Sequence, residues 1–264
     1  IGAESLCLGH QPVRDWVIRQ GVRLIRDNNV DWVLQDGQTV VKYCDKETHT
    51  HHPQDSNWAN SEEGLDYILA EIQRQAPQAV WEHCANGGQM MTFKMVQQYV
   101  TSITNDASGP LGSRQGVFGA TYPFPPRFAD RYMAETDLDV YTTRSFMFGG
   151  PWVFMNRLAD MSASDRALAT NEIRLYKQMR ATINGGKVFH LTARPDEGQL
   201  DAIQSINRTT GVAVALVTRD LTEDNFYQLR FKDLDAAATY RVRFESDARL
   251  LTMTGAQLLN AGVR

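Results

Sequence analysis

Apolar side chains recur at three- and four-residue intervals in three stretches of the chain, which is the spacing of one face of an α-helix. The first predicted helix covers residues 12–27 and has a proline in its first turn. The second begins at Ser61, a capping residue type, and ends before Pro77. The third covers residues 164–183 and stops at an Asn-Gly-Gly sequence. Each predicted helix has one apolar face that another element must cover.

Short runs rich in β-branched and aromatic residues lie between these helices and predict strands. The predicted strands of this half of the chain cover residues 29–36, 79–84, 99–104 and 141–148, and residues 116–124 are predicted as a strand or an extended segment. Beyond residue 186 the apolar period changes to two, which indicates an antiparallel β domain. Its predicted strands cover residues 187–191, 202–207, 211–218, 226–231 and 239–244. We therefore expect an α/β domain over residues 1–185 and a β domain over residues 186–264.

Composition narrows the class of protein. With 264 residues and 42% apolar residues, the chain can bury a proper core. The net charge of -4 gives no basic excess, so we expect neither nucleic acid nor an anionic membrane surface as a partner. No apolar run reaches the roughly 18 to 20 residues of a membrane span. Three scattered cysteines favour a reducing compartment such as the cytoplasm, but no targeting segment can be read and the compartment stays open.

Two aspartates each follow a predicted strand. Asp36 ends the strand over residues 29–36, and Asp106 follows the strand over residues 99–104. In α/β barrels the carboxyl ends of the strands carry the chemistry, and two carboxylates about 5 to 5.5 Å apart are the equipment of a retaining glycosidase. Aspartates at strand ends also cap helices or accept hydrogen bonds from loops, and the spacing by itself favours that role. Asp45 is the rival candidate for the catalytic carboxylate that we assign to Asp36.

The polar loop over residues 37–60 is much longer than a usual connection between a strand and a helix. It contains Cys44, His49, His51 and His52, which lack the pair-plus-pair spacing of a structural zinc site. We therefore predict no metal and no cofactor. The imidazole of His51 and the ring of Trp58 are better explained as groups that hydrogen-bond and stack on a sugar.

Several blocks of sequence resemble one family, the α-galactosidases of glycoside hydrolase family 36. The segment Cys-Ala-Asn-Gly-Gly over residues 84–88 resembles the family's Cys-Ala-Ser-Gly-Gly-Gly-Arg block. Val-Asp-Trp-Val-Leu-Gln-Asp over residues 30–36 resembles the family's Val-Asp-Tyr-Leu-Lys-Trp-Asp, whose last residue is the nucleophile. Residues 101–106, with Phe-Pro-Pro over residues 124–126 downstream, resemble the block that carries the acid/base aspartate. The resemblance implies that Asp36 is the nucleophile and Asp106 the acid/base.

The resemblance covers nearly the whole chain, but it corresponds to the later part of a full-length family member. It implies part of a (β/α)8 TIM-type barrel followed by a C-terminal antiparallel β-sandwich, which explains why about five βα units are counted instead of eight. It also implies that Cys84, Gly87 and Gly88 contact the sugar. The expected function is retaining hydrolysis of α-glycosides, with an oligosaccharide or glycoside as substrate.

The chain departs from the family pattern at several positions, including Leu34 and Met90. Leu34 stands where the family has a sugar-binding lysine, and Met90 stands where the glycine block continues to arginine. These changes remove charge-assisted hydrogen bonds, so the sugar and the linkage stay open. Two alternatives therefore remain, a catalytically altered carbohydrate-binding relative and a transglycosylase of the same family. The oligomeric state, including a homo-oligomer, also stays open.

Overall fold

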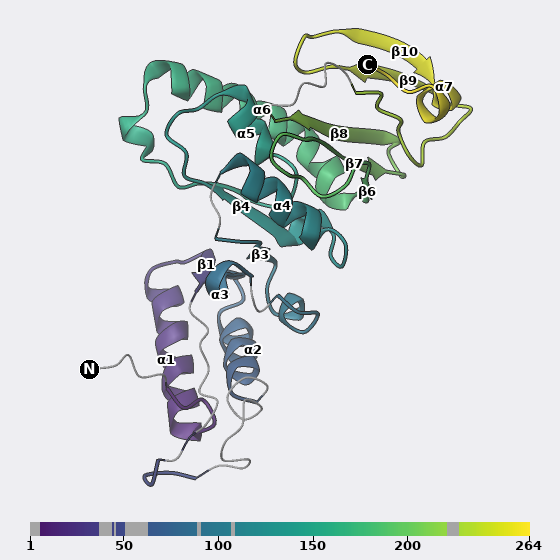
Figure 1. Cartoon of the computed structure of the whole chain (residues 1–264). Helices are drawn as coiled ribbons and strands as arrows, with labels where there is room; N and C mark the ends of the chain where they lie inside the picture. The colour runs from purple at the N-terminus through teal and green to yellow at the C-terminus, as the bar shows by residue number, and fades with distance from the viewer. Residues whose placement is uncertain are drawn as a thin grey trace. The chain divides into compact units, whose positions relative to one another are not determined.

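The computed structural model describes residues 6–36, 44, 46–50, 63–88, 91–106, 109–220 and 227–264 (Figure 1). The chain divides into two compact units, Ile1–Ile103 and Thr104–Arg264, which are described separately. Among the described residues, none of the helices has the length and apolar character needed to cross a membrane.

Unit 1 is built from three parallel strands and two principal helices. Its elements are α1 (Gln11–Asp27), β1 (Trp32–Gln35), α2 (Asp66–Gln75), β2 (Val80–His83), α3 (Ala85–Gly88), a 3-10 turn (Met95–Gln97) and β3 (Thr101–Ile103). Strand β2 lies between β1 and β3, with Val33 opposite Trp81 and His83 opposite Ser102. Three predicted strands and the predicted first helix are thus confirmed within a few residues, although each strand is shorter than expected.

Helices α1 and α2 lie side by side (Figure 1). Their apolar side chains pack against one face of this sheet. The buried contacts join the apolar face of each helix to Trp81 of β2, which is 8% exposed. Gly21 lets the helices approach closely, since a Cβ atom there would lie 2.6 Å from Cδ1 of Ile72. The three-four spacing of apolar residues therefore marked the buried face of α2 correctly. In α1 it included Trp16 and Leu24, which are 51% and 60% exposed.

The first part of unit 2 alternates helices with a parallel strand pair. Its elements are α4 (Pro110–Ala120), a 3-10 turn (Pro126–Phe128), β4 (Ala129–Met133), α5 (Val140–Ser145), β5 (Trp152–Phe154), a second turn (Leu158–Asp160) and α6 (Ala163–Gly185). Strands β4 and β5 pair in parallel, with Tyr132 opposite Val153. The α/β architecture of both units is consistent with part of a (β/α)8 barrel. Helix α6 confirms the helix predicted over residues 164–183.

Two strand predictions in this region are wrong. Residues 116–124 lie largely in helix α4 and the turn after it, and residues 141–148 lie largely in helix α5. Helix α5 begins because the Asp139 side chain accepts a 2.6 Å hydrogen bond from the Thr142 backbone N–H, which offsets the β preference of two adjacent threonines. Helix α4 has glycine where a larger residue would collide, since a Cβ atom on Gly116 would lie 2.6 Å from the Thr104 hydroxyl oxygen.

The second part of unit 2 is antiparallel. A three-stranded sheet contains β6 (Lys187–His190), β7 (Leu200–Asn207) and β8 (Val212–Arg219), and a hairpin contains β9 (Thr239–Arg243) and β10 (Leu250–Thr254). Helix α7 (Gly255–Asn260) follows the hairpin (Figure 1). Four of the five predicted strands are confirmed. The fifth, over residues 226–231, is reduced in its described part to a single bridge between Leu229 and Val263.

One apolar cluster is shared by the antiparallel strands of both sheets and by helix α7. It is centred on Ile206, Leu229 and Leu258, and the side chains of Val242 and Met253 from the hairpin pack against it. The predicted division between residues 185 and 186 falls between the end of α6 and the start of β6. That division and the sandwich arrangement of the two sheets stay predictions.

Candidate functional site

The carboxyl ends of β1 and β2 bring two of the predicted site residues together. Asp36 follows β1 directly, and Cys84 follows β2 directly. The backbone N–H of Cys84 donates a 2.9 Å hydrogen bond to the carbonyl oxygen of Gln35, so the two strand ends are held side by side. Asp36 is exposed, whereas Cys84 is 4% exposed. The arrangement puts a solvent-accessible carboxylate at the end of a parallel strand, where α/β folds build their sites.

The glycine pair after Cys84 adopts a backbone conformation that other residues disfavour. Gly87 and Gly88 have φ angles of +68° and +79°. A tight turn is closed by a 2.7 Å hydrogen bond from the Gly88 N–H to the Cys84 carbonyl oxygen. Because a Cβ atom is strained in this region of φ, the two glycines are required by the turn itself. This local requirement holds whether or not a ligand approaches the loop.

The side chains of β1 and β2 alternate between a helix-covered face and an open face. Val33 packs into the core beneath the helices, while Trp32 and Leu34 on the other face are 44% and 46% exposed. Continuing the alternation by two residues puts Asp36 on the open face with Leu34. The position at which the sequence departs from the family's lysine therefore lies on the same face as the candidate nucleophile.

Glu82 on the open face was not singled out from the sequence. Its side chain is 1% exposed, it lies opposite Leu34 in the strand register, and its Oε2 accepts a 2.7 Å hydrogen bond from Nε1 of Trp32. A buried carboxylate is costly unless it is hydrogen-bonded, so this contact is a notable feature of the face. The signal in the sequence was the position of Glu82 two residues before Cys84, which alternation assigns to the same face.

His83 lies on the opposite face of β2 and is buried. Its Nδ1 is 3.0 Å from the Ser102 hydroxyl, and its ring meets the edge of Tyr99 with centroids 5.0 Å apart. Burial lowers the pKa of His83 from 6.5 to about 4, and the negative charge of Asp36 opposes this shift. The imidazole is therefore neutral near pH 7. It lies within electrostatic range of the Asp36 carboxylate at the end of β1.

Asp106 lies in unit 2 and is exposed. Its backbone carbonyl accepts a 2.8 Å hydrogen bond from the Tyr132 hydroxyl of β4, which fixes the backbone that carries the carboxylate. Asp36 belongs to unit 1, so the pairing of the two carboxylates stays a prediction. His51 and Trp58, predicted to contact the sugar, lie outside the described residues.

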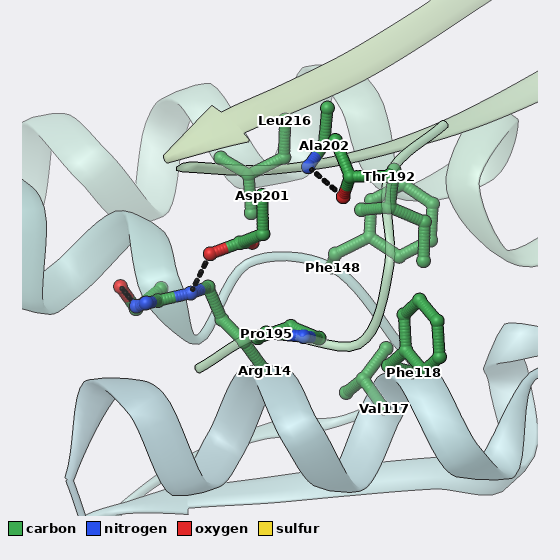
Figure 2. Close-up of a pocket in the computed structure, with 11 residues that line it drawn as sticks. Arg114, Val117, Phe118, Phe148, Thr192, Pro195, Asp201, Ala202 and Leu216 are labelled. Atoms are coloured by element: carbon green, nitrogen blue, oxygen red, sulfur yellow. Dashed lines mark hydrogen bonds and ion pairs between the residues drawn. The ribbon is translucent and has the colours of Figure 1, made fainter. Parts of the chain in front are cut away.

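A small pocket in unit 2 has a different character (Figure 2). Figure 2 shows Arg114 of α4 directed at Asp201 of β7, and the two side chains form a 2.9 Å ion pair that is almost completely buried. The remaining lining is mostly apolar, with Val117, Phe118 and Phe148 among its members. Because its two charges neutralise each other and join a helix to the antiparallel sheet, we interpret the pocket as packing and not as a sugar site.

Comparisons with known proteins agree with the family suggested by the sequence. No protein-family model matches the chain. The chain superposes on the α-galactosidase AgaA of Geobacillus stearothermophilus with a TM-score of 0.81 and 18% identity, over 99% of this chain and 38% of that one. AgaB of the same organism gives a TM-score of 0.80 with 17% identity, over 99% and 37% of the two chains.

The chain has the fold of the glycoside hydrolase family 36 α-galactosidases over this span. The sequence of a probable α-galactosidase C from Aspergillus terreus is 20% identical over 262 residues, which are 96% of this chain and 33% of the relative. The chain thus spans about a third of the length of that curated relative. The resemblance read from the sequence blocks is confirmed at the level of fold.

Proposed function

We propose that the protein containing this chain is a retaining α-glycoside hydrolase of the α-galactosidase type, and that this chain supplies the later barrel and a C-terminal β-sandwich. The observation that carries the proposal is the exposed carboxylate of Asp36 at the carboxyl end of β1, with Cys84 and the left-handed glycine turn at the end of the next strand. The fold comparisons support it, because the two structures compared above are α-galactosidases.

In the proposed reaction, Asp36 attacks the anomeric carbon while Asp106 protonates the oxygen of the departing group. The glycosidic bond breaks and a covalent glycosyl ester forms on Asp36. Asp106, now ionised, then removes a proton from water, which attacks the same carbon and releases the sugar with retained configuration. The mechanism needs Asp36 ionised, and its side chain is exposed at the end of β1.

The substrate is proposed to be an oligosaccharide or another α-glycoside. Structures of AgaA variants are complexes with raffinose and with stachyose, which are oligosaccharides. Cys84, Gly87 and Gly88 would contact the sugar hydroxyls, and His51 and Trp58 would contact the sugar from the loop that follows Asp36. The chemistry needs no cofactor.

A second candidate function is favoured by Leu34. An apolar side chain that is 46% exposed on the face of Asp36 cannot donate the charge-assisted hydrogen bonds of a lysine. The protein would then bind carbohydrate with altered catalysis, or transfer the glycosyl group to a sugar acceptor instead of to water. Product analysis with added sucrose or galactose separates transfer from hydrolysis, and ligand-dependent thermal stabilisation without turnover identifies a binding protein.

The decisive test replaces Asp36 in the full-length protein. Asp36→Ala should abolish hydrolysis of activated aryl α-galactosides, because no nucleophile remains, while Asp36→Asn should retain sugar binding in calorimetry. Asp31→Asn is a matched control, since this exposed aspartate lies at the opposite end of β1. Turnover by Asp36→Ala at the level of the control would exclude the proposed role.

The role of Asp106 has its own signature. Asp106→Ala should slow hydrolysis of substrates with poor leaving groups by about 10²- to 10⁴-fold, since a general acid contributes that much. A leaving group of low pKa needs little protonation. For such a substrate, formation of the glycosyl ester on Asp36 should therefore slow far less than for a substrate with a poor leaving group. An equal loss for both kinds of leaving group would argue against general-acid catalysis by Asp106.

A further inference from the structure

Three potential metal ligands lie close together near the start of helix α1 in unit 1. One ligand atom each from Cys7, Cys44 and His49 lies within 4.8 Å of the others. The Cys44 sulfur is 3.3 Å from Nε2 of His49. Cys44 is buried with 4% of its surface exposed, and the other two residues are half-buried. All three belong to the described part of unit 1, so the cluster does not depend on the placement of unit 2.

We propose that Cys7, Cys44 and His49 bind a Zn²⁺ ion. In a tetrahedral zinc site with bonds of about 2.3 Å to sulfur and about 2.0 Å to nitrogen, neighbouring sulfur and nitrogen ligands lie roughly 3.5 Å apart. The 3.3 Å separation between Cys44 Sγ and His49 Nε2 is close to that value. Two thiolates and one imidazole are also the donor set that zinc prefers over magnesium or calcium, which bind oxygen.

Neighbouring residues support the imidazole ligand. The ring of His10 packs on the ring of His49, with centroids 4.3 Å apart and a tilt of 31°. His10 immediately precedes α1, and its backbone N–H donates to the Cys7 carbonyl oxygen at 3.1 Å. Cys7 and His49 are therefore both held by residues at the start of the helix. A water molecule would complete the coordination as the fourth ligand.

The site would join two segments that are distant in sequence. Cys7 precedes helix α1, whereas Cys44 and His49 follow β1 and Asp36. A metal bond between them closes a long loop, and such cross-links stabilise the folded state because the unfolded chain does not hold the ligands together. The ion would thus attach the segment after the proposed nucleophile to the helix that covers the sheet. Its presence does not depend on the proposed glycosidase activity.

The spacing of residues in the sequence did not reveal this site. The histidines of the loop were considered with Cys44 only, and Cys7 is 37 positions earlier. Loop and helix start meet only in the folded chain. The structure thus supplies the second thiol that the sequence pattern lacked.

The test measures metal in the full-length protein, purified with a reductant and without chelator. Inductively coupled plasma mass spectrometry should find about one zinc ion per chain. Co²⁺ exchanged into the protein should give a thiolate-to-cobalt charge-transfer band in the near ultraviolet. Cys7→Ser, Cys44→Ser and His49→Ala should each lower the zinc content several-fold or abolish the band. Cys84→Ser is the matched control, since this buried thiol lies outside the cluster.

Two further results would overturn the proposal. One is protein that binds no zinc or cobalt even after reconstitution under reducing conditions. The other is a Cys84→Ser variant that loses as much metal as the cluster variants, which would indicate unspecific binding to thiols. For variants that fold poorly, alkylation of the native protein decides the question, because zinc should protect Cys7 and Cys44 from the reagent. Equal alkylation with and without zinc would also refute the site. None of these measurements uses glycoside turnover.

Discussion

Protonation of His83 should make the stability of unit 1 depend on pH. An unfolded histidine has a pKa near 6.5, while burial lowers the pKa of His83 in the folded protein to about 4. Above pH 6.5 the imidazole is neutral in both states and the stability is complete. As the pH falls from 6.5 to 4, the unfolded chain takes up a proton that the folded chain does not, so folding stability is lost in that window.

The size of the effect follows from the two pKa values. The difference between 6.5 and about 4 corresponds to a loss of about 3 kcal/mol in the free energy of unfolding, complete near pH 4. The side chain is 1% exposed and its Nδ1 contacts Ser102, so solvent screens the effect little. A loss of this size is a large part of the usual stability of a domain.

The assay compares urea unfolding of the full-length wild type and His83→Asn between pH 8 and pH 4, followed by tryptophan fluorescence. Trp32 and Trp81 lie in the same unit and report on it. His83→Asn should be less stable at pH 8, because the ring no longer packs on Tyr99, but its stability should fall less on acidification by about 3 kcal/mol. Ser102→Ala keeps the titrating group and should retain the steep pH dependence.

Parallel pH profiles for the wild type and His83→Asn would refute this reasoning. They would mean that the imidazole titrates alike in the folded and unfolded chains. The burial of the ring would then have no electrostatic consequence.

Three further variants test contacts within unit 2. Arg114→Ala leaves the buried Asp201 carboxylate without its cation and should lower the unfolding free energy by about 3 to 5 kcal/mol, measured by urea unfolding; a loss below 1 kcal/mol would contradict the buried ion pair. Gly255→Ala should lower the melting temperature by several degrees, since its Cβ would collide with the Asp235 carbonyl oxygen, and an unchanged melting temperature would argue against that packing. Thr254→Ala should cost about 1 kcal/mol by removing the capping box of α7, whereas Thr254→Ser should cost little.

Sequence periodicity located the helices and strands that have one buried face and one solvent-exposed face. Helix α1 and strand β9 are of this kind, and their bounds agree with the prediction within one residue. In such elements each apolar residue occurs at the spacing of a single geometry, so the period identifies the element.

The elements that were missed have a different composition. Strand β4 contains Asp130 and Arg131, both almost completely buried, which hide its apolar pattern. The guanidinium of Arg131 donates to the carbonyl oxygens of Gly150 and Pro151 at 2.9 and 3.0 Å. These acceptors follow helix α5 in the chain, so only the folded backbone provides them. A buried cation whose acceptors are distant carbonyl groups leaves no local signal in the sequence.

The candidate site shows the same division between local and distant information. Asp36 could be placed at a strand end because one short apolar run precedes it, and the left-handed turn at Gly87 and Gly88 has a local cause in glycine. The environment of Leu34 could not be predicted from the sequence, because it depends on the register between β1 and β2. That register puts Leu34 opposite Glu82, whose carboxylate accepts from the indole of Trp32.

A lysine at position 34 would stand beside a buried carboxylate that it could neutralise. In this chain a neutral indole N–H from Trp32 contacts the Glu82 carboxylate instead, at 2.7 Å. Hydrogen bonds to an ionised group are stronger when both partners are charged, so the indole compensates only part of the missing cation. The change at Leu34 therefore alters the electrostatics of the whole face that carries Asp36. A neutral leucine next to Glu82 gives this face one positive charge fewer than a lysine would.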